Sequence, residues 1–329
     1  MSKKYLTVLL ISFVALLLAV AMVLLLIAVG QKNRSVQTGS PNGEDSLKDK
    51  NCILVLGKDK ASGLFDVIML ASVDENGSNA CIMQIPRDTY AEYTEKSYRK
   101  INVAPKILGE EGFCEFLSDN LGVEIQGYIS FELDAFSKAV DLIGGVEMTL
   151  PRALDYNDPE QGLYIHLPKG TQVLDGEKAQ MLVRFRKGYI RGDLDRLDVQ
   201  KQFMAAFFCK VKDTVNILNA YGFASELLPY INTNISATSL VSLGLKALTV
   251  DSDKIGFLTL PGEDAREDGG ASYYVMSRPA TDEVMEKYFG KSEGVLDTNG
   301  AFLNEKSARF AEIYNKKYEY SLMFAKDMQ

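Results

Sequence analysis

The sequence predicts an α/β fold in which helices alternate with the strands of a mixed sheet. Short apolar and β-branched runs open the folded part of the chain, and segments with apolar residues every three or four positions follow them. The first pattern is typical of buried strands and the second of amphipathic helices. Because the two kinds of segment are interspersed along the chain, helices packed in layers on a sheet are expected.

The predicted sheet begins with three strands. They are CILVLG (52–57), VIMLASVD (67–74) and ACIMQI (80–85). ENGS joins the last two, and an Asn-Gly pair between apolar runs is a strong signal for a tight hairpin. The second and third strands should therefore be antiparallel neighbours.

Helices are predicted next, over 107–121 and 134–143, with the strand YISFEL between them and GGVEMTL as a strand after them. Asp175 is the expected N-cap of a short helix that passes into a strand holding Arg184 and Arg186. A long helix is predicted from Asp195 to Lys212. Later elements are a helix over 217–228, a helix capped by Ser236, the strand KIGFLTL and a final helix from about Asn304.

The N-terminal region predicts a membrane anchor. Residues 6–29 are almost wholly apolar and long enough to cross a bilayer. A cleaved signal peptide is the alternative, but its apolar core is usually about 7–15 residues and a small-residue cleavage site follows it. The expected organisation is a short tail over 1–5, the anchor over 6–29, a flexible polar stalk over 30–50 and one folded body over 51–329.

The charge of the body argues against general nucleic-acid binding. After residue 50 the chain holds 30 Lys and Arg against 41 Asp and Glu, a net charge of −11. A protein that binds nucleic acid needs an excess of basic residues to neutralise phosphates. The four cysteines, Cys52, Cys81, Cys114 and Cys209, lack the spacing of a zinc site. Buried thiols are expected, and disulfides remain an alternative outside the cell.

A set of basic and polar residues predicts an anion site in this acidic body. Arg184 and Arg186 are two apart, so a strand would place them on one face, and Arg196 and Gln200 are four apart, so a helix would align them. Guanidinium groups bind phosphate oxygens in bidentate fashion. Separate surface arginines are the alternative. The candidate anion-binding residues are Arg87, Lys100, Arg184, Arg186, Arg196 and Gln200.

Two aspartates flank the loop between the first two predicted strands. Asp59 and Asp66 lie in GKDKASGLFD. Mg²⁺ prefers one or two carboxylates together with substrate oxygens, so this pair is a candidate metal site beside a phosphate. Simple solvation of the loop is the alternative interpretation.

Seven motifs occur in an order that resembles the LytR-CpsA-Psr family of cell-envelope phosphotransferases. They are LGKD, FDVIML, IPRDTY, KINVA, DLIGGVEM, LDGEKAQMLVRFR and GDLDRLDVQKQ, between about Ile53 and Phe207. The resemblance implies an α/β/α sandwich and an enzyme that transfers a glycopolymer from a polyprenyl pyrophosphate to peptidoglycan, with release of polyprenyl phosphate. It also implies a cytoplasmic N-terminus and an extracellular body, an orientation that the nearly balanced flanking charges leave open.

The same resemblance assigns roles to individual residues. It implies that Asp59 and Asp66 hold Mg²⁺ and that the candidate anion-binding residues hold the pyrophosphate. Asp193 is expected either to accept the proton of the attacking hydroxyl or to orient an arginine. Asp88 is expected to hold Arg87 or to cap the following turn. Apolar residues that would line a tunnel for the lipid, or else form ordinary core, are Phe116, Ile129, Phe131, Phe136, Val140, Phe185 and Phe203.

Three positions depart from the pattern of the family. Leu64 and Val199 stand where arginine is common, and Val67 stands where threonine is common. The two missing arginines, at Leu64 and Val199, keep a second hypothesis open, a receptor that binds polyprenyl phosphates without turnover. A pyrophosphate hydrolase would use the same site with water as the acceptor. A transcriptional attenuator is disfavoured, because the sequence has no recognisable helix-turn-helix pattern.

Overall fold

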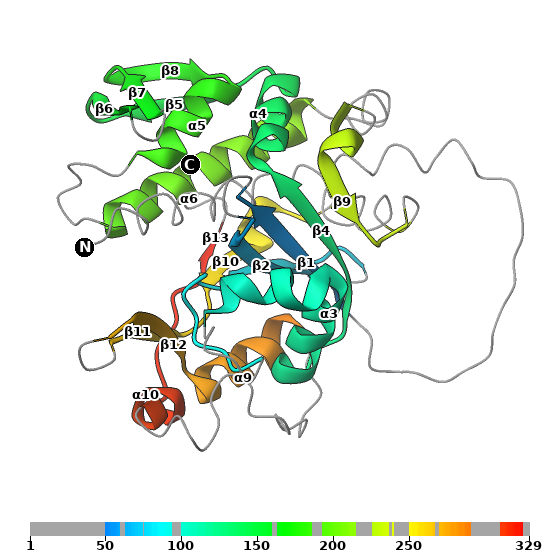
Figure 1. The fold of residues 1–329 in the computed structure, drawn as a ribbon. Helices are drawn as coiled ribbons and strands as arrows, with labels where there is room; N and C mark the ends of the chain where they lie inside the picture. Colours follow the sequence, from blue (N-terminus) through cyan, green and yellow to red (C-terminus); the bar gives the residue numbers. More distant parts are fainter. Residues whose placement is uncertain are drawn as a thin grey trace, which may run out of the picture.

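A seven-stranded mixed sheet forms the centre of the molecule (Figure 1). The computed structural model describes residues 50–59, 63–74, 76–93, 100–159, 163–185, 193–214, 226–236, 239, 250–266, 270–290 and 310–324. The strand order is β13-β10-β3-β2-β1-β4-β9. The strands are β1 (Lys50–Lys58), β2 (Phe65–Asp74), β3 (Ala80–Gln84), β4 (Ile125–Glu132), β9 (Ile231–Thr233), β10 (Ile255–Thr259) and β13 (Met323–Phe324). β4 is parallel to β1 and β10 to β3, whereas the other neighbours are antiparallel.

The hairpin predicted between the second and third strands is confirmed. β2 and β3 pair antiparallel from Val73 opposite Ala80 to Met69 opposite Gln84. The amide of Gly77 donates to the carbonyl of Asp74 at 2.9 Å, and Gly77 has a φ of +66°. Glycine adopts this left-handed conformation without steric cost, which explains why the turn forms at Asn76-Gly77.

Helices cover both faces of the sheet. On one face α4 (Leu133–Leu142), α5 (Gly176–Arg184) and α6 (Asp193–Thr214) pack with Ile53 and Val55 of β1. On the other face α3 (Ala104–Leu121) and α9 (Arg278–Tyr288) pack with Leu54 and Leu56. Alternate residues of β1 thus enter different cores, as the two-residue repeat of a strand requires. The predicted α/β class and mixed sheet are confirmed.

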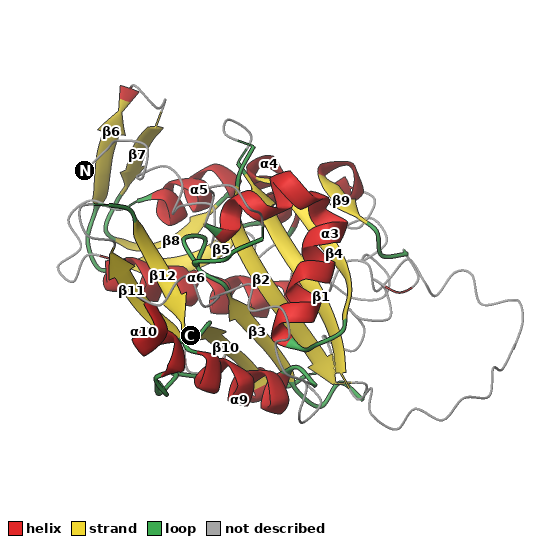
Figure 2. Ribbon diagram, turned by 60° about the horizontal axis from the view of Figure 1, so that its bottom comes forward, coloured by secondary structure: helices red, strands yellow, loops and turns green. Residues whose placement is uncertain are grey.

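Three two-stranded antiparallel sheets extend the central body (Figure 2). β5 (Val146–Leu150) pairs with β8 (Gly170–Leu174), β6 (Leu154–Asp158) with β7 (Leu163–Leu167), and β11 (Gly262–Arg266) with β12 (Ser272–Met276). Short 3-10 helices cover Ile101–Val103, Leu228–Tyr230 and Ser252–Lys254, and α10 (Ala311–Asn315) precedes β13. The β11–β12 hairpin borders the predicted anion site, as its contacts below show.

The short helix after Asp175 is confirmed, but the strand predicted for Arg184 is wrong. Asp175 caps α5, because its carboxylate accepts a hydrogen bond from the amide of Lys178 at 2.8 Å. The helix continues through Arg184, its last residue, and the backbone becomes extended at Phe185. Leu182 and Val183 are both buried although they are adjacent in sequence, a pattern that helix packing satisfies. Arg186 lies outside the described residues.

Three more of the predicted helices and one more predicted strand are present in the structure. The helices predicted over 107–121, 134–143 and 195–212 correspond to α3, α4 and α6, and KIGFLTL contains β10. Ser236 accepts a hydrogen bond from the amide of Ser239 at 3.1 Å, as a cap would. Most of the helix predicted over 217–228 and the helix start near Asn304 lie outside the described residues.

The membrane anchor predicted over 6–29 and the stalk over 30–50 lie outside the described residues, apart from Lys50. Within the described ranges, no helix combines the length and the apolar character that a bilayer crossing requires. The four cysteines are free thiols. Cys52, Cys81 and Cys114 are buried and Cys209 is partly buried, in agreement with the first of the two expectations.

Candidate active site

Asp59 and Asp66 lie at the two ends of the loop that connects β1 to β2. Lys58 pairs with Phe65 and Gly57 with Val67, so Asp66 is the extra residue of a β-bulge. A bulge changes the direction in which a side chain points and is common beside functional sites. Asp66 is fully buried and Asp59 is partly buried. The loop is closed by backbone hydrogen bonds of 2.8 Å from Asp59 to Leu64 and from Gly63 to Asp59.

A buried ion pair joins Asp66 to Arg87. Arg87 Nη1 donates to Asp66 Oδ1 at 3.0 Å, and the two side chains are 5% and 0% exposed. Arg87 follows β3 in the turn that begins at Pro86. An ion pair this deep keeps its charges only when both groups are well partnered. The pair therefore fixes a guanidinium group next to the candidate metal-binding aspartate.

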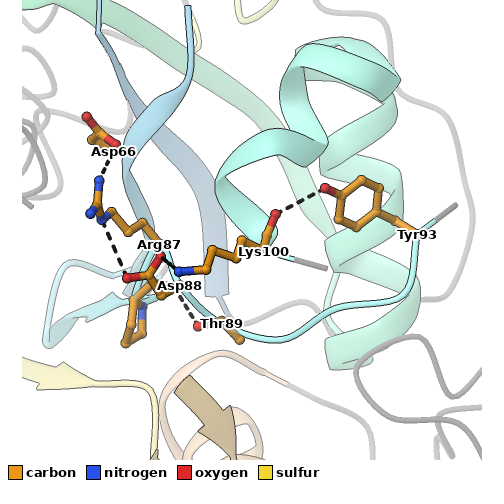
Figure 3. A network of polar contacts seen from close by, with 7 residues as sticks. Asp66, Arg87, Asp88, Thr89, Tyr93 and Lys100 are labelled. Atoms are coloured by element: carbon orange, nitrogen blue, oxygen red, sulfur yellow. Dashed lines mark hydrogen bonds and ion pairs between the residues drawn. The ribbon is translucent and has the colours of Figure 1, made fainter. Parts of the chain in front are cut away.

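A second ion pair continues this network toward solvent. Lys100 Nζ donates to Asp88 Oδ1 at 2.6 Å, and Asp88 Oδ2 lies 3.8 Å from Arg87 Nε. Figure 3 shows Asp66, Arg87, Asp88 and Lys100 as one chain of alternating charges. The expectation that Asp88 holds Arg87 is confirmed as an ion pair. The shorter contact of Asp88 with Lys100 was not predicted, because the two are twelve positions apart and no local pattern relates them.

Backbone hydrogen bonds hold the segment that carries these charges, residues 87–90. On one side Asn102 donates to the carbonyl of Arg87 at 3.2 Å and Ile101 to that of Thr89 at 2.9 Å. On the other side Tyr274 of β12 donates to Asp88 at 2.9 Å and receives a bond from Tyr90 at 2.8 Å. The segment is thus fixed between a 3-10 helix and a hairpin more than 170 residues away in sequence. Such support reduces the motion of the charged side chains.

Arg184 is the last residue of α5. Burial, which has the larger effect, lowers the pKa of its guanidinium group, and the nearby charge of Asp59 acts in the opposite direction. Arg184 is therefore close enough to Asp59 for the two charges to interact. A partly buried arginine close to a carboxylate is suited to bind an anionic substrate that carries a metal ion.

Three more of the predicted site residues belong to α6. Asp193 is the first residue of this helix, and Arg196 and Gln200 lie one turn apart within it. The prediction that a helix carries Arg196 and Gln200 four residues apart is confirmed for the backbone. Their side chains are outside the described part of the chain, as is that of Asp193. The roles expected for them, pyrophosphate binding by Arg196 and Gln200 and proton transfer or arginine orientation by Asp193, remain predictions.

Six of the seven predicted lipid-lining residues share one core. Phe116 packs instead in the core formed with α3 and α9, on the other face of the sheet, so the structure does not bring it together with the rest. The six are each at most 3% exposed, as expected both for ordinary core and for the wall of a closed tunnel. They lie between the sheet and α4, α5 and α6, and are Ile129, Phe131, Phe136, Val140, Phe185 and Phe203.

Two positions that depart from the expected pattern also pack in this core. Val67 is fully buried, and Val199 is partly buried against the same cluster. Leu64 accepts the backbone bond from Asp59 described above. Val67 and Val199 thus contribute to apolar packing at positions where a polar or a charged side chain is expected. Arg152, a basic residue that was not among the predicted site residues, has its guanidinium carbon 5.8 Å from the centre of the Phe185 ring.

The carboxylates fit a magnesium ion that is shared with a substrate. Within the described residues, no group of three or more His, Cys, Asp or Glu side chains converges as a complete protein cage. Mg²⁺ does not require such a cage, because it usually binds through one or two carboxylates and takes its other ligands from phosphates and water. Asp59 and the bulge residue Asp66 provide donors of this type. Together with Arg87, Lys100 and Arg184, these carboxylates provide the charges of both signs that a phosphate-bearing anion and its metal ion require.

Comparisons with known proteins agree with the motifs. A family model described as the LytR_cpsA_psr family matches residues 27–289. TagV of Bacillus subtilis, named a polyisoprenyl-teichoic acid–peptidoglycan teichoic acid transferase, is 28% identical over 64% of this chain and 55% of its own length. The cell wall biosynthesis protein LcpA of Corynebacterium glutamicum is 25% identical over 82% of this chain and 56% of its own length. This chain thus spans little more than half the length of these two relatives.

The fold also has a solved counterpart. The crystal structure of protein gbs0355 from Streptococcus agalactiae aligns with 80% of this chain and 95% of its own, with a TM-score of 0.65. The sequence identity is 20%, so this similarity concerns the fold.

Proposed function

This chain belongs to the LytR-CpsA-Psr family, and we propose that it is a membrane-anchored, Mg²⁺-dependent phosphotransferase that attaches a glycopolymer to peptidoglycan. The donor is a polyprenyl-pyrophosphate-linked glycopolymer, and polyprenyl phosphate is released. The name of the TagV relative supports the reaction class. The observation that supports the proposal most is the chain of charges from Asp66 through Arg87 and Asp88 to Lys100, with Arg184 and Asp59 beside it.

The proposed reaction requires positive charge at fixed places. A hydroxyl oxygen of peptidoglycan attacks the phosphorus that carries the glycan, and the bond from that phosphorus to the bridging oxygen breaks. The bridging oxygen leaves with the electron pair as part of polyprenyl phosphate. Negative charge grows on this oxygen and on the nonbridging oxygens, so prearranged cations stabilise the transition state. Arg87, Lys100 and Arg184 are the described residues suited to this task.

The proton of the attacking hydroxyl must go to a base. Asp193, the first residue of α6 and nine positions after Arg184, is our candidate. Mg²⁺ bound by Asp59 and Asp66 would add charge stabilisation on the pyrophosphate. The ion pair with Arg87 orients the carboxylate of Asp66. In the proposed complex it would hold the guanidinium group of Arg87 next to the metal-bound phosphates.

A lipid-binding receptor is the second candidate function. Leu64 and Val199 stand at the two positions where arginine is common, and Val199 packs against the core. Fewer charged groups near the pyrophosphate favour binding without turnover. The two functions share a ligand, so binding measurements alone do not separate them.

A transfer assay tests the proposal. The full chain, purified in detergent, is incubated with a synthetic polyprenyl-pyrophosphate glycan, Mg²⁺ and peptidoglycan oligomers. We expect a phosphodiester-linked conjugate and polyprenyl phosphate, detected by mass spectrometry. Release of free glycan phosphate without conjugate would favour the hydrolase, and tight binding without either product would favour the receptor. Failure to bind any polyprenyl phosphate would contradict all three.

Lys100 provides the matched variant for this assay. Its ion pair with Asp88 is partly exposed, at 20% and 28%, so its loss should change the free energy of unfolding by less than about 1 kcal/mol. A charge-assisted contact with the substrate contributes roughly 1.5–3 kcal/mol, so Lys100→Met should lower kcat/KM by at least about tenfold. Wild-type rates in Lys100→Met would remove this residue from the proposed site.

A further inference from the structure

Three aromatic rings pack together, and one of them is Tyr90 at the end of the charged segment 87–90. The rings of Tyr90 and Phe310 are 5.2 Å apart, those of Tyr90 and Tyr273 are also 5.2 Å apart, and those of Tyr273 and Phe310 are 6.0 Å apart. All three pairs are edge-to-face, and the residues are 1%, 8% and 3% exposed in the order Tyr90, Tyr273, Phe310. Aromatic pairs of this geometry add stability beyond the area that they bury. With Val275 they form a small core separate from the two that cover the sheet.

This aromatic cluster contacts the charged network directly. Lys100 Nζ lies over the ring of Tyr273, 5.8 Å from its centre, and Tyr90 forms an antiparallel bridge with Lys100. Tyr90 also donates its amide proton to Tyr274, whose own amide binds the carbonyl of Asp88. Two contacts therefore position the Lys100 ammonium group, the salt bridge with Asp88 and the ring of Tyr273.

Phe310 belongs to a C-terminal segment that lies outside the family match. The match ends at residue 289, and the described segment 310–324 follows it. This segment is attached to the body at several places. The carbonyl of Lys316 accepts a hydrogen bond from Ser277 Oγ at 2.5 Å, Lys317 Nζ lies 2.9 Å from Glu283, and β13 pairs with β10. The attachment holds Phe310 against the other two rings.

We propose that Phe310 is a positioning residue for the transfer reaction, acting through Tyr90 and Tyr273 on Asp88 and Lys100. The expected effect on catalysis rests on the proposed function. The expected effect on the position of segment 87–90 does not. Phe310 fills the space behind Tyr90 and Tyr273, and a smaller side chain leaves part of that space empty. Close-packed interiors respond to such a loss by small shifts of the neighbouring groups. Those neighbours hold the ammonium group of Lys100, so catalysis decreases although no substrate contact is removed.

The catalytic part is tested with a matched pair of variants. Phe289 is 2% exposed and packs in the core under α3 and α9, away from the cluster. Phe310→Leu should lower kcat by about fivefold or more with little change in KM, because misplacement of charge affects mainly the transition state. Phe289→Leu removes the same atoms from a comparably buried position and should retain the wild-type kcat. An equal decrease of kcat in both variants would show a general effect of lost packing and overturn the proposal.

A double variant identifies the route. If Phe310 acts through Lys100, the effect of Phe310→Leu should largely disappear when Lys100 is already methionine. Effects of the two changes that multiply independently would contradict this route.

Hydrogen exchange provides a measurement that does not require activity. The amides of Tyr90, Ile101 and Tyr274 hold the charged segment in place. In Phe310→Leu they should exchange several-fold faster than in the wild type, relative to the amides of β1 and β2, and in Phe289→Leu they should not. Unchanged exchange at these three amides would overturn the inference. If the wild type forms no conjugate, the proposed function fails, and this exchange comparison alone decides whether Phe310 positions the segment.

Discussion

Asp59 and Asp66 are candidate ligands for the same metal ion, but the fold depends on them to different degrees. Asp66 is buried in the bulge of β2 and paired with Arg87. Asp59 is partly buried in the connecting loop, where its backbone makes the closing hydrogen bonds. The same chemical change at the two positions should therefore separate metal binding from stability.

Asp66→Asn should reduce both stability and activity. Removing one charge of a buried pair costs about 3–5 kcal/mol of unfolding free energy, because the remaining charge loses its partner. Asp59→Asn should lower the affinity for Mg²⁺ while it changes the unfolding free energy by less than about 1 kcal/mol, as usual for a substitution near the surface. Chemical denaturation measures the first effect, and transfer rates at increasing Mg²⁺ measure the second. Full transfer by Asp59→Asn in excess chelator would refute the metal assignment.

The packing of α4 against α5 sets the position of Arg184. At Gly176, the first residue of α5, the amide donates to Asp141 Oδ1 at 2.8 Å and the carbonyl accepts from Ser137 Oγ at 3.1 Å. A Cβ atom at Gly176 would lie 2.7 Å from the Cα of Ser137. Real Cβ atoms do not approach backbone this closely, so a side chain here would force the two helices apart. Arg184 is at the other end of the same short helix and would move with it.

Gly176→Ala should therefore destabilise the protein by about 1–3 kcal/mol, as overpacking does, and should also lower the rate of transfer. Gly112→Ala is the matched control. Gly112 lies within α3, and an added Cβ would meet only the Leu108 Cβ at 3.4 Å. Alanine is a better helix former, so this variant should be unchanged or more stable by up to about 1 kcal/mol. Urea denaturation compares them, and equal stability of the two variants would contradict the account of helix contact.

At the scale of the whole molecule, the lipid part of the proposed donor requires a site close to a membrane. We expect residues 6–29 to anchor the chain and the body to lie outside the cell. After cell fractionation the protein should remain with membranes through a high-salt wash, which removes proteins held only by charge. Protease added to intact, wall-stripped cells should digest the body, with a cytoplasmic protein as the control for lysis. Complete protection of the body would contradict the proposed orientation.

The sequence by itself determined the features that depend on neighbouring residues. Short apolar and β-branched runs predicted β1, β2 and β3, and Asn76-Gly77 predicted the turn between β2 and β3. Asp175 predicted the start of α5. Turn geometry and helix capping involve groups only a few positions apart, so the local sequence is enough to predict them. The order of the motifs also identified the family.

Only the tertiary structure decided which charges meet. The local alternation of VRFR suggested a strand for Arg184, but the burial of Leu182 and Val183 against the helical core extends α5 through it. No local pattern shows that Asp88 binds Lys100 or that Phe310 packs on Tyr90, 220 positions away. Such contacts form only when the folded chain brings distant segments together, and the three aromatic rings form a small core of their own. Their free energy depends on packing and burial that the folded chain alone provides.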